Sequence, residues 1–145
     1  MEITPIKGML DLGITPVLYG DAVPDEKKGI SILSGDQIVV YLAKKLNSSR
    51  VVLGVDVDGV FAANPKKEEE PMLVKKITLA DRKLVDLLGT AGSDDVTGGM
   101  KKKVEELLEL AKQGVEAEIV NATKPNFLKK AVNGESGLGT IICRR

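Results

Sequence analysis

The chain has 145 residues, 43% of them hydrophobic, which suffices for one domain with a buried core. Lys plus Arg and Asp plus Glu both total 21, so no net charge favours nucleic acid or an anionic membrane as a partner. The absence of His and the single Cys143 exclude an internal disulfide and the usual zinc ligands, and a chain without an apolar run of membrane-spanning length is expected to be cytoplasmic.

Apolar runs of strand length alternate with amphipathic segments of helix length along the chain. This alternation predicts an α/β fold of three α/β/α layers around a mostly parallel sheet. No repeat or flexible linker divides the sequence, so we expect one domain over residues 1–145. In chain order we expect a short helix closed by Gly13, a strand at 14–19, a hairpin across 20–28 returning at 30–33, a helix at 36–47, strands at 50–57 and 73–77, helices at 78–88 and 97–113, a strand at 117–121, a helix at 125–132 and a strand at 140–143.

The sequence DVTGGM at residues 95–100 directly precedes Lys101–Lys103 and a helical pattern. Gly98 and Gly99 allow the backbone to pass close to an anion, and the first turn of a helix offers unpaired N–H groups. Lys103 lies four residues beyond Gly99 and falls over the same first turns. The arrangement suits the β- or γ-phosphate of a nucleotide. The alternative is a glycine-lined helix start with solvated lysines; a nucleic-acid patch is the least favoured interpretation, because no aromatic residues are interleaved.

Carboxylates stand where predicted strands give way to the next element. Asp36 follows Gly35 at the start of a helix, a position where ligands collect in open α/β sheets. It either caps that helix or orients catalytic lysines or Mg²⁺ near a transferring phosphoryl group. Asp56 and Asp58 follow the most apolar strand, with Gly59 permitting a sharp turn. Either the two residues belong to an ordinary Asp-Gly turn, or one of them accepts hydrogen bonds from ribose hydroxyls or adenine.

Five ordered segments of the sequence are residues 17–21, 32–36, 54–61, 95–100 with Lys103, and 119–121 with 139–140. Together these segments resemble the amino acid kinase superfamily, and within it the archaeal isopentenyl phosphate kinases. The resemblance covers nearly all of the chain but only about the C-terminal half of the family pattern. It also implies a carbamate kinase-like fold.

The resemblance implies a role for each candidate residue on the nucleotide side. Asp56 and Phe61 match positions that contact the nucleotide. Gly98 and Gly99 match the loop over the ATP phosphates, and Lys103 matches the lysine that balances charge on the transferring group. On the acceptor side, Asp36 matches the aspartate that organises the catalytic lysines, and Gly35 lies beside the substrate phosphate.

The activity implied is ATP-dependent, Mg²⁺-assisted phosphorylation of isopentenyl phosphate to isopentenyl diphosphate, by a homodimer. The N-terminal lysine, the glycine-rich segments and the histidine of the family pattern have no counterpart in this sequence. We therefore expect that the chain alone binds nucleotide weakly and does not turn over, and that a missing N-terminal half is a partner. The alternatives are an acetylglutamate, carbamate or nucleoside monophosphate kinase of the same family, or a non-catalytic nucleotide-binding module.

Overall fold

The computed structural model describes residues 2–62, 72–88 and 99–145. By its internal contacts the chain divides into two compact units, Met1–Asn47 and Ser48–Arg145. The expectation that residues 1–145 work as one domain stays a prediction.

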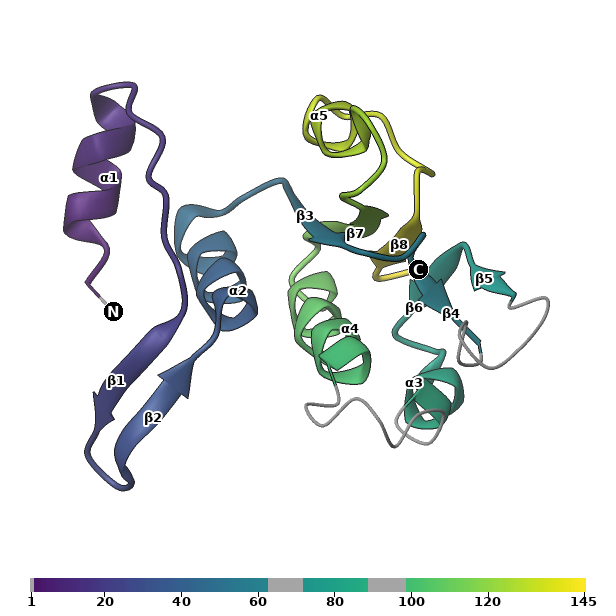
Figure 1. Cartoon of the computed structure of the whole chain (residues 1–145), viewed down its shortest axis with the longest axis horizontal. Coiled ribbons are helices and arrows are strands. Elements are labelled where there is room, and N and C mark those ends of the chain that lie inside the picture. Colours follow the sequence, from purple (N-terminus) through teal and green to yellow (C-terminus); the bar gives the residue numbers. More distant parts are fainter. Residues whose placement is uncertain (1, 63–71, 89–98) are drawn as a thin grey trace. The chain divides into compact units, whose positions relative to one another are not determined.

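The first unit holds α1 (Thr4–Asp11), β1 (Asp21–Asp25), β2 (Gly29–Leu33) and α2 (Gly35–Leu46) (Figure 1). Strands β1 and β2 form an antiparallel hairpin, with Asp21 opposite Leu33 and Asp25 opposite Gly29, which confirms the predicted hairpin. The strand expected at residues 14–19 is wrong, because those residues lie outside every strand. A strand needs a neighbour for its backbone hydrogen bonds, and no described residue pairs with this segment.

Helix α2 begins and ends at local signals that the sequence carries. Ser34 is its N-cap: the Ser34 side chain accepts from the backbone N–H of Gln37, and the Gln37 side chain accepts from the backbone N–H of Ser34. Such a reciprocal pair satisfies two helix-start donors. At the other end, Asn47 adopts the left-handed conformation, with φ 51°, that commonly terminates helices.

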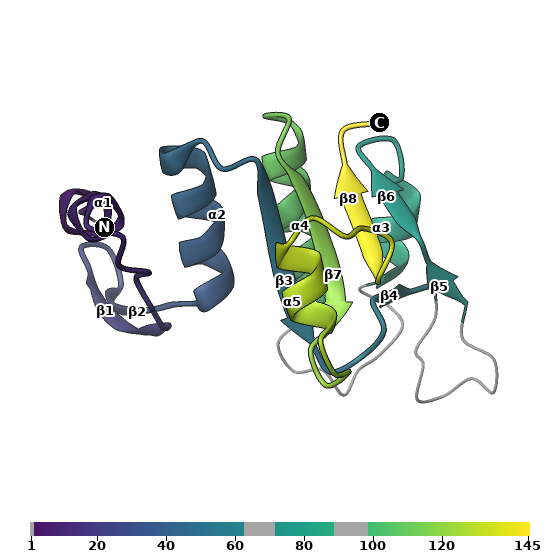
Figure 2. The ribbon, with the colours of Figure 1, turned by 90° about the horizontal axis from the view of Figure 1, so that it is seen from above.

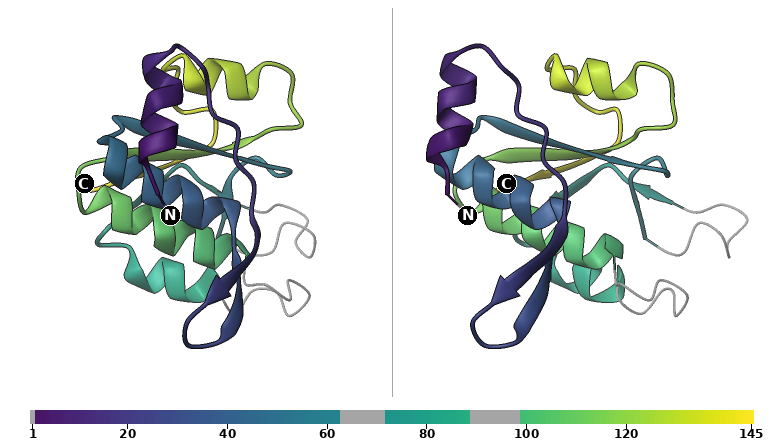
Figure 3. Two further views of the ribbon diagram at one scale, coloured as in Figure 1. Left: turned by 90° about the vertical axis from the view of Figure 1, so that its left-hand side faces the viewer. Right: turned by 60° about the vertical axis from the view of Figure 1, so that its left-hand side comes forward.

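The second unit is a sheet covered on both faces. Its four main strands run in the order β3-β7-β8-β6, with β3–β7 and β6–β8 parallel and β7–β8 antiparallel. Helices α3 and α4 cover one face and α5 the other (Figures 1 and 3), so the predicted three layers and mostly parallel sheet are confirmed. The elements are β3 (Arg50–Val55), β4 (Val60–Phe61), β5 (Leu73–Val74), β6 (Lys76–Thr78), α3 (Arg82–Leu88), α4 (Gly99–Ala111), β7 (Glu116–Asn121), α5 (Phe127–Val132) and β8 (Thr140–Cys143).

The core of this unit lies between α4 and the sheet. Helix α4 buries Val104, Leu107, Leu110 and Ala111, against sheet residues such as Ile119, which is also fully buried. The apolar spacing within residues 97–113 predicts an inward face of Val104, Leu107, Leu108 and Ala111, which includes Leu108 and leaves out Leu110. Leu108 is only half-buried and lines a groove of about 600 Å³ between α3 and α4, so the inward face is rotated slightly from the predicted one.

Two element boundaries differ from the predicted ones. Helix α3 starts at Arg82 rather than at residue 78, because Thr78 is the last residue of β6 and the carboxylate of Asp81 accepts from its backbone N–H (2.8 Å) and its hydroxyl (2.7 Å). Strand β3 ends at Val55, two residues before the predicted end. Residues 97 and 98 of the predicted motif helix lie outside the described residues.

Candidate functional site

Loops from several strands meet at one edge of the second unit's sheet. The parallel strands β3 and β7 both end there, at Val55 and Asn121, and the reversed strand β8 starts there, at Thr140. Helix α4 leads into β7 through a short turn, so its first residue, Gly99, faces the same edge (Figure 2). This carboxyl edge is where open α/β sheets bind ligands, and the structure brings Asp56 and the start of α4 to it.

Asp58 is the most strongly engaged carboxylate at this edge. It lies 2.8 Å from the side-chain amide of Asn121 and 2.7 Å from the ammonium of Lys124. The hydrogen bond from Lys124, and after it the one from Asn121, hold the pKa of Asp58 below its ordinary value of 3.8. Asp58 is thus occupied by protein partners, whereas the side chain of Asp56, two residues earlier, is exposed to solvent.

Sequence reasoning gave no role to Asn121 or Lys124, which organise the loop that follows β7. The amide oxygen of Asn121 accepts from the backbone N–H (2.9 Å) and the hydroxyl (2.6 Å) of Thr123. The ammonium of Lys124 lies 5.4 Å from the centre of the Phe127 ring. The signal that points to Asn121 is its place at the end of a buried strand, because a buried polar residue there needs hydrogen-bond partners of its own.

The start of α4 carries the lysines of the predicted phosphate motif. Lys103 is half-buried and Lys102 is exposed. Lys101 lies 3.7 Å from a carboxylate oxygen of Asp86 and 3.9 Å from one of Glu105, so its charge is shared within the protein. Phe61, a predicted nucleotide contact, belongs to β4 and is half-buried. Gly98 lies outside the described residues.

Gly35 and Asp36 belong to the first unit, where they open α2. The helix is capped by Ser34, so the interpretation of Asp36 as the N-cap is wrong, and Asp36 lies inside the first turn. Gly35 has open space beside it: a Cβ added there would meet no atom within 4 Å.

The described parts of the chain contain no cluster of three or more His, Cys, Asp or Glu side chains able to hold a metal ion. In the same residues no helix is both long and apolar enough to cross a lipid bilayer.

A comparison with protein families places these features in a known context. The model of the amino acid kinase family matches residues 1–121. The chain belongs to the amino acid kinase family. This confirms the resemblance seen in the five ordered sequence motifs.

Among curated proteins, the chain is similar to the isopentenyl phosphate kinase of Methanothermobacter thermautotrophicus. The two are 44% identical over 143 residues, which cover 97% of this chain and 53% of that kinase. The isopentenyl phosphate kinase of Methanocaldococcus jannaschii is 37% identical over 135 residues, 92% of this chain and 48% of that kinase. The chain therefore spans about half the length of the curated relatives it matches.

Solved structures of kinases are similar to this chain as well. An X-ray structure of isopentenyl phosphate kinase superimposes with a TM-score of 0.78 and 38% identity, covering 97% of this chain and 50% of that one. The carbamate kinase of Giardia lamblia bound to AMP-PNP superimposes with a TM-score of 0.65 and 23% identity, covering 100% of this chain and 50% of that one. The second likeness concerns the fold alone, and it confirms the carbamate kinase-like architecture.

Proposed function

We propose that this chain is the nucleotide-binding portion of a cytoplasmic kinase that transfers the γ-phosphoryl group of ATP to isopentenyl phosphate. The products are isopentenyl diphosphate, an isoprenoid precursor, and ADP. The observation that carries the proposal is the 44% identity to an isopentenyl phosphate kinase over 97% of the chain. The groups gathered at the carboxyl edge of the sheet support the nucleotide side of this assignment.

On the nucleotide side, the backbone N–H groups of Gly98 and Gly99 bind the ATP phosphates, and the ammonium of Lys103 stabilises the charge of the transferring phosphoryl group. This fits a helix start that faces the ligand-binding edge, since N–H groups and a nearby cation favour an anion there. Asp56 accepts hydrogen bonds from the nucleoside, and Phe61 lies against it. In support, the carboxylate of Asp56 is exposed while that of Asp58 is held by Lys124.

On the acceptor side, Gly35 lies beside the phosphate of the substrate and Asp36 orients the catalytic lysines. Capping of α2 by Ser34 supports this role, because Asp36 is not needed to cap the helix. The open space beside Gly35 supports close approach of a ligand to the backbone.

The side chains of the proposed site could accept Mg²⁺ only when it is already bound to the phosphates of the nucleotide. The described residues provide no cluster of metal-binding side chains, and Mg²⁺ in kinases is held largely by substrate phosphates and water, with one or two carboxylates. We therefore assign no protein ligand to it. Bound with ATP, Mg²⁺ would neutralise phosphate charge, whereas Lys103 supplies the protein's own cation.

A partner polypeptide completes the site in this proposal. The chain spans about half the length of its relatives, and the first unit leaves much apolar surface uncovered: Val17 is 91% exposed and Tyr19 79%. Several highly exposed apolar side chains within one unit are typical of an interaction surface. The polypeptide that corresponds to the other half of the relatives is the proposed partner, and the completed kinase is a homodimer. The other exposed large apolar side chains here are Met9, Leu10, Leu12, Ile14, Leu18, Ile30 and Ile32.

Reconstitution tests the proposal. The chain is mixed with the half of the Methanothermobacter kinase that it does not match, and transfer of the γ-phosphoryl group of ATP to isopentenyl phosphate is measured. We expect no turnover by either piece alone, turnover by the mixture, and loss of turnover with Asp36→Asn. If a folded complex fails to phosphorylate isopentenyl phosphate but phosphorylates acetylglutamate, carbamate or a nucleoside monophosphate, that compound would replace isopentenyl phosphate as the proposed acceptor. A complex that binds ATP without transfer to any acceptor would make the chain a non-catalytic nucleotide-binding module.

A further inference from the structure

A single buried hydroxyl, at the first residue of β8, holds the paired strands β4 and β5. The side chain of Thr140 is fully buried. Its hydroxyl accepts from the backbone N–H of Val60 (2.8 Å) and donates to the backbone carbonyl of Val74 (2.6 Å). Its donor and one acceptor position are therefore used to hold the first residue of β4 and the last residue of β5.

The chain leading to β4 is pressed against the same hydroxyl. Gly59 has φ 140°, and a Cβ added there would lie 2.5 Å from the hydroxyl oxygen of Thr140. Glycine is therefore required at the point where the chain turns from Asp58 into Val60. The segment that turns here, residues 56–61, carries both nucleoside contacts of the proposed site, Asp56 and Phe61.

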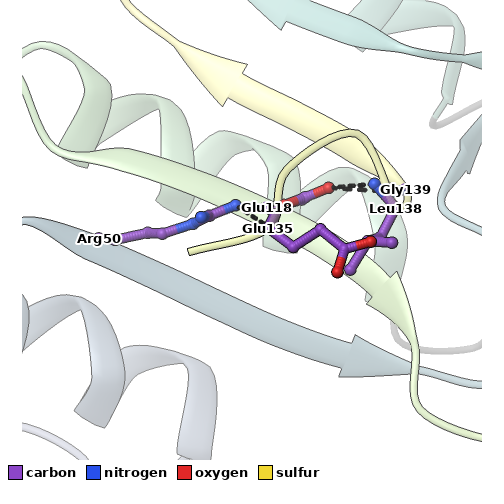
Figure 4. Close-up of polar contacts among 5 residues, drawn as sticks. All are labelled: Arg50, Glu118, Glu135, Leu138 and Gly139. Carbon is purple, nitrogen blue, oxygen red and sulfur yellow. Dashed lines mark hydrogen bonds and ion pairs between the residues drawn. The ribbon is translucent and has the colours of Figure 1, made fainter. Parts of the chain in front are cut away.

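The residues before Thr140 are held in turn by a carboxylate within the sheet. Glu118 of β7 is fully buried and forms an ion pair with Arg50 of β3 (Figure 4). Its other oxygen accepts from the backbone N–H groups of Leu138 (2.8 Å) and Gly139 (3.2 Å). Arg50 also donates to the backbone carbonyl of Glu135 (3.2 Å). The residues just before β8 are thus fastened to β7 through Glu118 and to β3 through Arg50.

We propose that Thr140 is a positioning residue that sets the conformation of residues 56–61, and that Glu118 holds Thr140 in place to do so. Thr140 acts through the backbone of Val60 and is not itself a nucleotide contact. The consequence for ligand binding rests on the proposed function: a loosened segment presents Asp56 and Phe61 poorly to the nucleoside, while the phosphate-binding start of α4 is unchanged.

Hydrogen exchange of the full chain tests the structural part. Thr140→Val keeps the shape of the side chain and removes both hydrogen bonds, so the amide of Val60 should exchange roughly tenfold faster or more. Thr140→Ser should restore protection, and Thr78→Val, which removes a hydroxyl bonded to Asp81 instead, should leave Val60 unchanged. Undiminished protection of Val60 in Thr140→Val would overturn the inference. If that variant does not fold, Thr140→Cys, with its weaker thiol partner, should show intermediate exchange.

Titration with two ligands tests the functional part by nuclear magnetic resonance. The sample is the chain mixed with the half of the Methanothermobacter kinase that it does not match. Thr140→Val should raise the Kd for ATP with Mg²⁺ about tenfold, leave the Kd for inorganic tripolyphosphate unchanged, and be rescued by Thr140→Ser. Equal weakening of both ligands would mean general disruption and would contradict a nucleoside-specific role. A wild-type mixture that binds neither ligand contradicts the proposed function and the nucleoside part of this inference, while the exchange experiment on the chain still decides whether Thr140 sets the conformation of residues 56–61.

Discussion

The side-chain amide of Asn121 donates a 2.8 Å hydrogen bond to the carboxylate of Asp58, a residue 63 positions earlier in the chain. Asp58 follows the end of β3, and Asn121 is the last residue of β7. These two strands are parallel neighbours, and their last residues, Val55 and Asn121, are in register. The bond therefore ties together the loops that leave these strands. Lys124 adds a charge to the same carboxylate from the second loop.

The engagement of Asp58 predicts a pH-dependent contribution to stability. Hydrogen bonds from Lys124 and then Asn121 lower the pKa of Asp58 in the folded state below 3.8, so the folded chain favours the ionised form. The contribution is present in full above pH 3.8 and is lost as the pH falls through the lower folded-state pKa. Because Asp58 is 42% exposed, we expect less than about 1 kcal/mol.

Thermal melts of wild type and Asp58→Asn across pH 2 to pH 7 (roughly the range over which carboxylates titrate) measure this effect. The difference in Tm should be largest near neutral pH and should shrink at the acid end. A Tm difference that stays constant through the acid range would refute an electrostatic origin.

Lys103 and Lys102 form a matched pair for testing the phosphate role. Both stand in the first turns of α4, but Lys103 is half-buried and Lys102 is exposed. Removing a charge that contacts phosphate should raise the Kd for ATP about tenfold or more, since charge-assisted contacts are the stronger ones. We expect this of Lys103→Ala and a near-wild-type Kd for Lys102→Ala, measured by calorimetric titration with Mg²⁺ present. Equal affinities of the two variants would remove Lys103 from the proposed site.

Gly35→Ala separates folding from ligand contact. A Cβ at Gly35 meets no atom within 4 Å, and the same is true of Gly8 in α1, so both alanine variants should fold. If the acceptor phosphate lies beside Gly35, the added methyl should reduce turnover of the reconstituted kinase by about tenfold or more, since small displacements of reacting groups are costly. Gly8→Ala should keep full turnover. A fully active Gly35→Ala variant would place the acceptor elsewhere.

Gly139→Ala should destabilise the second unit severely. A Cβ at this position would lie 1.9 Å from the backbone carbonyl oxygen of Ile119, so β7 and β8 would have to separate where they pair. We expect a loss of about 3 kcal/mol or more in the free energy of unfolding. Urea denaturation measures it, with Gly35→Ala as the control that should unfold like wild type. Similar urea midpoints for the two variants would show that β7 and β8 can move apart at little cost in stability.

Local patterns predicted most of the elements in the second unit. Strand β8 was predicted at its observed bounds, and β7 and α4 within a residue or two. Buried strands and amphipathic helices can be predicted in this way because each has a characteristic spacing of apolar residues. The cap of α2 was also readable: Ser34 and Gln37 have the spacing of a reciprocal capping pair, a clearer signal than the acidic residue at position 36. Residues 14–19 have the composition of a strand, but a strand also requires a partner that the described chain does not supply.

The interactions at the carboxyl edge were beyond sequence reasoning. A charged residue in the middle of an apolar strand, Glu118, gives no indication that its partner is Arg50, 68 residues away. The bond between Asp58 and Asn121 likewise depends on the register of β3 against β7. Such pairs follow from which strands become neighbours, and single-sequence periodicity carries no information on that.

The uncovered strip around Val17 and Tyr19 has a consequence for the life of this chain inside a cell. Chaperones and proteases bind polypeptide segments that expose hydrophobic side chains. If the partner polypeptide proposed above covers these residues, a copy of the chain without it would be bound by chaperones or degraded, and the abundance of the chain should follow that of the partner.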